Sequence, residues 1–172
     1  MHACAILETP AEDTFDQLAR LAAHLCGAAV AAIGFVGKDC EWVKSSAGME
    51  LGTLQNLASA HVLCRLALGG RLVQVKDASA DPVLRSHPLV QGPSRMRMAA
   101  CMPINTADGL TLGAVVILDA APRHLEESQR EALVAIASQA MALLEMRRQR
   151  RGMAQRAQER ALSEERFHLV AR

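Results

Sequence analysis

The sequence predicts an α+β domain with a central antiparallel β-sheet, flanked by N- and C-terminal helices and extended by a long C-terminal linker helix. Short apolar runs separated by turn residues alternate with segments of helical periodicity, a pattern typical of this class. The pair Asp108-Gly109 between two apolar runs predicts a β-hairpin. With 172 residues, 51% of them hydrophobic, the chain is long enough for one domain and an appendage.

The N-terminal half predicts a helix, a hairpin and a second helix. Leu18, Leu21 and Leu25 recur at helical spacing, and Gly27 ends that helix. A continuous apolar run and an alternating segment follow, joined by turn residues, which predicts a pair of antiparallel strands. The expected elements are a helix over 12–26, strands over 29–36 and 41–46, a loop over 48–57 and a helix over 58–68.

The C-terminal half predicts three further strands and a long helix. A stretch over 88–94 that contains Pro and Gly predicts irregular structure between the first two of these strands. Pro122 interrupts the chain before a helix that begins near Glu126. The expected strands cover 72–75, 96–104 and 110–118.

The long helix changes character near its middle. Its first part carries one apolar stripe, whereas the segment after Met146 is rich in Arg, Gln, Glu and Ala and offers few side chains to bury. That composition predicts a coiled-coil-like linker. We expect three parts: a domain over 1–148, a helical signalling linker over 149–165 and the start of a further domain over 166–172. The stripe expected at a dimer interface comprises Leu133, Ile136, Ala140, Leu143 and Leu144.

Charge and composition exclude several classes of function. The formal net charge is +1, so no chain-wide field attracts nucleic acid or an anionic membrane. No apolar stretch approaches the roughly 20 residues that span a bilayer, and no signal-peptide pattern opens the chain, so we expect a cytoplasmic protein. Aromatic residues make up only 2% of the sequence, which argues against a pocket that stacks a flat conjugated ligand.

The five cysteines are odd in number, scattered, and form no C-x-x-C pair. This spacing supports neither a disulfide framework nor a four-cysteine zinc site, so free buried thiols are the expectation. We accordingly expect no metal and no resident cofactor. The cysteines are Cys4, Cys26, Cys40, Cys64 and Cys101.

Several short segments, in this order and spacing, together resemble one family. They include Trp42-Val43-Lys44-Ser45, Ala60-His61-Val62-Leu63, Asp77-Ala78-Ser79-Ala80-Asp81-Pro82, Pro103-Ile104 and Arg123-His124-Leu125. From about Leu7 to Arg148 the chain resembles a GAF domain of bacterial sensor proteins, such as histidine kinases and diguanylate cyclases. Ser163 to Val170 resembles the opening of a PAS domain.

The resemblance implies a non-catalytic sensory domain in a bacterial signal-transduction protein. Such a domain would dimerise through its terminal helices and relay a signal to downstream PAS and kinase or cyclase modules, without binding nucleic acid or inserting into a membrane. Arg95 and Arg97 could grip an anionic effector, and Met96, Met98 and Met102 could line a soft pocket. The pocket candidates are His61, Cys64, Met96, Arg97, Met98, Cys101 and Asp119.

Alternative functions of the fold remain open at this point. A free methionine sulfoxide reductase would use pocket cysteines, here Cys64 and Cys101, and would need their Cα atoms closer than about 7 Å. Covalent bilin attachment would use Cys64 beside His61, and a metal or haem site would add His24 or His87. The set of residues that binds cyclic nucleotides in this family has no counterpart here. A pure dimerisation module would differ only in lacking a cavity.

Overall fold

The computed structural model describes residues 13–37, 41–56 and 66–171. The chain divides into two compact units, Met1–Ala140 and Met141–Arg172. The first contains the whole sheet and the shorter helices, and the second consists, where described, of the distal part of one long helix. No helix within these described ranges combines the length and apolar character that crossing a membrane requires.

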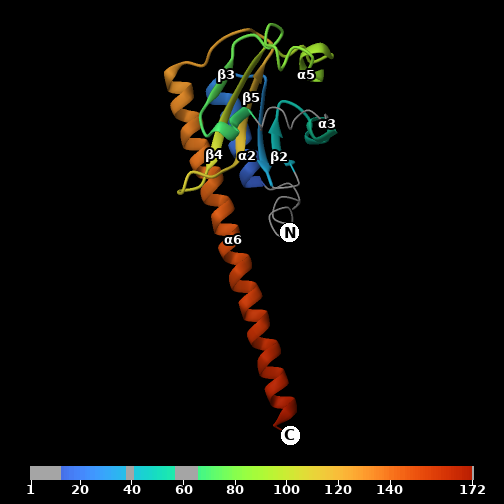
Figure 1. Ribbon diagram of the computed structural model, residues 1–172, viewed down its shortest axis with the longest axis vertical. Coiled ribbons are helices and arrows are strands. Elements are labelled where there is room, and N and C mark those ends of the chain that lie inside the picture. The colour runs from blue at the N-terminus through green and yellow to red at the C-terminus, as the bar shows by residue number, and fades with distance from the viewer. Residues whose placement is uncertain (1–12, 38–40, 57–65, 172) are drawn as a thin grey trace. The chain divides into compact units, whose positions relative to one another are not determined.

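The first unit is built on a five-stranded sheet in the order β2-β1-β5-β4-β3, with every neighbouring pair antiparallel (Figure 1). This arrangement confirms the predicted α+β class and both predicted hairpins. The strands are β1 (Val30–Val36), β2 (Glu41–Ala47), β3 (Val73–Val75), β4 (Met98–Asn105) and β5 (Thr111–Asp119).

Helix α2 (Asp13–Cys26) covers one face of the sheet, which we call the α2 face. Its buried side chains recur at helical spacing and pack on the side chains at odd-numbered positions of β1. Phe15 meets Phe35 edge to face, with ring centroids 5.8 Å apart. The Ser45 hydroxyl donates to the Phe15 carbonyl at 3.1 Å, which fixes the helix to β2 as well.

Helix α6 (Glu127–Val170) begins beside the end of α2, where Gln129 of its first turn donates to the Cys26 carbonyl, and it contributes residues to both units. The main-chain N–H of Leu125 donates to the Gln74 amide oxygen of β3 at 3.0 Å, and this position of β3 pairs with Ala100 of β4. Within the first unit, the buried residues of α6 are Leu133, Ile136, Ala137 and Ala140.

Three short elements differ from the sequence predictions. Helix α3 (Leu51–Asn56) stands where a loop was predicted, because Leu54 is buried in the core although Gly52 weakens the helical pattern. A one-turn helix, α5 (Pro88–Gln91), occupies the stretch predicted to be irregular. Of the helix predicted over 58–68, residues 58–65 lie outside the described part, and a 3₁₀ turn, η1 (Ala67–Gly69), follows.

Candidate functional site

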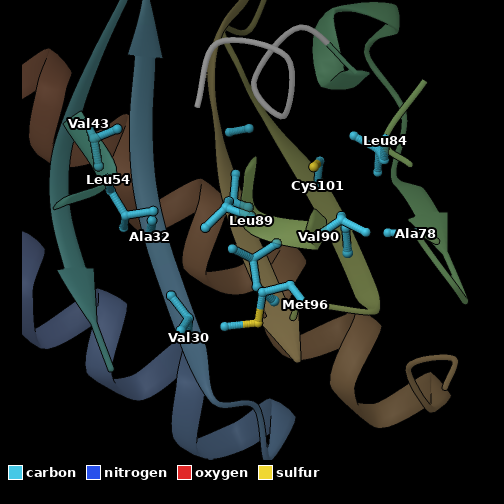
Figure 2. Close-up of a cluster of buried hydrophobic side chains, with 14 of the residues drawn as sticks. Val30, Ala32, Val43, Leu54, Ala78, Leu84, Leu89, Val90, Met96 and Cys101 are labelled. Atoms are coloured by element: carbon cyan, nitrogen blue, oxygen red, sulfur yellow. The ribbon is translucent and has the colours of Figure 1, made fainter. Parts of the chain in front are cut away.

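The face of the sheet opposite α2 carries a second apolar cluster. Figure 2 shows Leu84, Val90 and Met96, which follow β3 in the chain, gathered with Val30 and Cys101 of the sheet. We call the segment 77–97 the covering loop and this side of the sheet the loop face. The cluster comprises Val30, Ala32, Val43, Leu54, Ala67, Ala78, Leu84, Leu89, Val90, Met96, Ala99, Cys101, Ala114, Val116 and Leu118.

The covering loop is held by its own polar side chains. The Asp81 carboxylate accepts from the main-chain N–H groups of Val83 and Leu84, both at 2.9 Å. His87, only 5% exposed, caps α5, where its Nδ1 accepts from the Leu89 N–H at 3.1 Å. At Leu84 and Leu89, these contacts satisfy backbone groups that burial would otherwise leave without partners.

Between the covering loop and the sheet lies a cavity of about 10 Å³, roughly the room that one water molecule needs. Apart from His87, its lining is apolar. The lining residues are Ala78, Leu84, His87, Leu89, Val90, Met96, Met98, Ala99 and Leu118. The described residues therefore fill most of this face with small and flexible side chains.

Alternation along β4 separates the predicted pocket residues. Cys101 pairs with Val116 and belongs to the loop-face cluster, as does Met96 just before the strand. Met98 borders the small cavity at the start of β4, whereas Met102 pairs with Val115 and lies outside that cluster. Of the three methionines, Met96 and Met98 therefore line the small cavity together, and Met102 does not. His61 and Cys64 lie outside the described residues.

Arg97 is engaged with main-chain groups of its surroundings. Its Nη1 donates to the carbonyls of Val90 at 3.3 Å and Met96 at 3.2 Å. Its own N–H donates to the Asp119 carbonyl at 2.8 Å, and its carbonyl accepts from the Ala78 N–H at 2.5 Å. Its guanidinium therefore holds the covering loop, and the predicted partner Arg95 is exposed with a φ of 43°.

Asp119 lies at the end of β5, where its carboxylate faces the helices rather than the loop-face cluster. Its Oδ2 accepts from Arg123 Nε at 3.0 Å. Arg123 Nη2 also donates to the carbonyls of Cys26 at 2.7 Å and Gly27 at 3.3 Å, at the C-terminus of α2. Gln129 Nε2 reaches the same Cys26 carbonyl at 3.1 Å. Asp119 therefore belongs to a junction of β5, α2 and α6, which differs from its predicted place in a pocket.

The two described cysteines lie on opposite faces of the sheet. Cys26 is buried on α2, and Cys101 is buried in the loop-face cluster. Burial raises the pKa of the Cys26 thiol above its ordinary value, against a smaller lowering by the Arg123 guanidinium. Neither of these two thiols is in a disulfide, and their places on opposite faces do not make them a redox pair. The predicted pair of Cys64 with Cys101 involves a residue outside the described part.

The predicted metal ligands are separated as well. His24 is exposed in the last turn of α2, and His87 is buried under the covering loop. No group of three or more His, Cys, Asp or Glu side chains able to hold a metal occurs among the residues that the structure describes.

The stripe predicted for a dimer interface divides between two environments. Leu133, Ile136 and Ala140 are buried inside the first unit, because this part of α6 covers the chain's own core. Leu143 and Leu144, at the start of the second unit, are only half-buried. Sequence periodicity placed all five on one helix face but could not show where the domain ends.

Comparisons with known proteins agree with this geometry. The family model of the GAF domain matches residues 10–144. A cyclic di-GMP phosphodiesterase of Pseudomonas aeruginosa is 32% identical over 119 residues, which cover 69% of this chain and 20% of that protein. The chain thus spans about a fifth of the length of this curated relative.

Solved structures share the fold at low sequence identity. A domain assigned to a two-component sensor histidine kinase of Sinorhizobium meliloti 1021 superposes with a TM-score of 0.64 at 14% identity, over 87% of this chain and 99% of that one. A type II free methionine-R-sulfoxide reductase of Thermoplasma acidophilum gives 0.60 at 14% identity, over 76% and 89%. At this identity, both likenesses establish the fold alone.

Proposed function

Because the chain belongs to the GAF domain family, we propose that it is a sensory, regulatory domain of a bacterial signalling protein and has no catalytic activity of its own. The observation that carries this proposal is the continuity of α6. The helix that covers the core of the first unit with Leu133 and Ile136 runs on without interruption as the second unit. A change in the domain can therefore act on the distal helix directly.

The relatives support a signalling role. The curated relative is a cyclic di-GMP phosphodiesterase, and one structural neighbour is assigned to a sensor histidine kinase. A domain that covers a fifth of such a relative would act as one module among several. We propose that α6 passes the signal to a following module of the PAS type and from there to a kinase, cyclase or phosphodiesterase module.

We further propose that two copies associate through their terminal helices. Apolar side chains stay exposed on α2, namely Leu21 at 45% and Leu25 at 43%. A second copy would cover these side chains in a bundle of four helices. The half-buried Leu143 and Leu144 would extend that contact along α6.

Replacement of Leu143 by Glu tests this association. We expect Leu143→Glu to convert the dimer to a monomer in light scattering, because a carboxylate at an apolar seam leaves a buried charge unpaired. The matched control is Ser138→Glu, an exposed position five residues earlier and about 140° around the helix, which should remain dimeric. A Leu143→Glu protein of unchanged dimer mass would contradict the proposal.

An enzyme assay tests the absence of catalysis. Reduction of free methionine sulfoxide would require a reactive thiolate and a resolving thiol, whereas Cys26 and Cys101 are buried on opposite faces. We expect no turnover of free methionine sulfoxide in the presence of a dithiol reductant. Turnover that is lost in Cys64→Ser or Cys101→Ser would establish the reductase instead.

A further inference from the structure

A continuous series of hydrogen bonds joins the covering loop to the start of α6. The series passes through two arginines, Arg97 and Arg123, which bind different groups of Asp119. Arg97 uses its main-chain N–H on the Asp119 carbonyl, and Arg123 uses its guanidinium on the Asp119 carboxylate. One residue at the end of β5 is thereby held by both the loop face and the helices.

On the loop side, Arg97 binds two distant points of the covering loop, Ala78 and Val90, and the carbonyl of its neighbour Met96. Its carbonyl holds the N–H of Ala78 at the beginning of the loop, and its guanidinium holds the carbonyls of Val90 and Met96 near the end. Ala78, Val90 and Met96 are also in the buried cluster, at 2%, 6% and 7% exposure. A displacement of the loop must therefore move or break the contacts of Arg97.

On the helix side, Arg123 binds the C-terminus of α2 and the first turn of α6. The Cys26 carbonyl is one of those that a helix end leaves without internal partners, and the guanidinium binds it together with the carbonyl of Gly27, the residue after the helix. Gln129 accepts from Arg123 Nη1 at 3.5 Å and from the Glu126 N–H at 3.0 Å. The latter contact caps α6, so Arg123 supports the residue that starts the helix.

We propose that Arg97, Asp119 and Arg123 form a coupling relay, in which the position of the covering loop biases the packing of α2 and the start of α6. The relay needs no change in the strands, because Asp119 is the last residue of β5 and its two partners are side chains and loop backbone. Its signalling role rests on the proposed function, but the coupling itself is measurable in the isolated chain.

Hydrogen exchange measured by mass spectrometry tests the relay from both ends. In Arg123→Gln we expect peptides from residues 77–97 to exchange about fivefold faster or more, although the hydrogen bonds of Arg123 go to Asp119, Gln129 and the end of α2. In Arg97→Gln we expect the same acceleration in peptides covering the first two turns of α6. Reciprocity follows because coupling between two sites acts equally in both directions.

Matched arginines provide the controls. Arg130→Gln removes a guanidinium that pairs with Glu127 on the same helix, and Arg85→Gln removes an exposed one from the covering loop. Neither should change exchange at the opposite end of the relay. Peptides from β2 serve as an internal reference, because a general loss of stability would accelerate them as well.

If hydrogen exchange becomes faster only in peptides next to each substituted residue, the proposed relay is wrong. If Arg123→Gln fails to fold, Asp119→Asn replaces it, since the amide keeps the acceptor and the size but removes the charge, and it should accelerate both ends. Dimer mass is measured on the same samples. A dimer without coupled exchange would refute the relay alone, whereas coupled exchange in a monomer would refute the proposed association alone.

Discussion

Truncation of Leu133 tests whether the first part of α6 belongs to the core of the domain. The side chain is 0% exposed, so Leu133→Ala removes three carbon atoms from a fully buried position. At about 0.8 kcal/mol for each carbon, the lost transfer free energy is about 2.4 kcal/mol. The cavity left behind adds to this, and we expect a total loss of about 3–4 kcal/mol in the free energy of unfolding.

Urea denaturation followed by circular dichroism measures this loss. The matched control is Val134→Ala on the next position of the helix, where the side chain is 53% exposed, and the expected loss there is below about 1 kcal/mol. The Leu133→Ala protein should keep its state of association under native conditions. A protein of unchanged stability that has lost its association would refute our assignment of Leu133 to the chain's own core.

Three further predictions concern the backbone and the thiol. Gly113→Ala should cost more than about 3 kcal/mol of unfolding free energy, because the added Cβ would lie 2.1 Å from the oxygen of Gly34. The control Gly69→Ala has open space around it and should stay within about 0.5 kcal/mol of the wild type. Equal urea midpoints for the two variants would contradict this prediction. Because the pKa of Cys26 is raised in the folded chain, the unfolded chain ionises this thiol first, and the free energy of unfolding falls as the pH rises past about 8.5. In urea denaturation at pH 7 and pH 10, Cys26→Ala should lose less of its free energy of unfolding between the two pH values than the wild type does. Gly152→Ala should stabilise the distal helix by about 1 kcal/mol, seen as later loss of helical signal on heating, and an unchanged melting curve would count against a continuous helix there.

The strands and long helices could be predicted because their signals are local. Alternating apolar residues, turn residues and the Asp108-Gly109 pair placed both hairpins, and helical spacing placed α2 and the start of α6. Helix α3 escaped prediction because it has only six residues and its main contribution is one buried side chain, Leu54. Six residues make fewer than two helical turns, which is too short for an apolar spacing to repeat.

The candidate site was less predictable, because it depends on contacts between distant segments. Strand parity decides that Cys101 and Met102 point to different faces, and the sequence of β4, apolar throughout, does not reveal which. The hydrogen bond from Arg123 to the Cys26 carbonyl joins residues 97 positions apart, so no local sequence pattern predicts it. The start of α6 did have a local sequence signal, because the spacing of Gln129 from Glu126 matches half of a capping box.

Native mass spectrometry of the freshly purified chain tests the central claim most directly, because it reports subunit number and bound small molecules together. A sensory domain that acts through paired terminal helices predicts a complex of two 18.5 kDa chains that persists on dilution into the low micromolar range. The mass of a single chain at every concentration would contradict the claim that this helix transmits a signal between paired subunits.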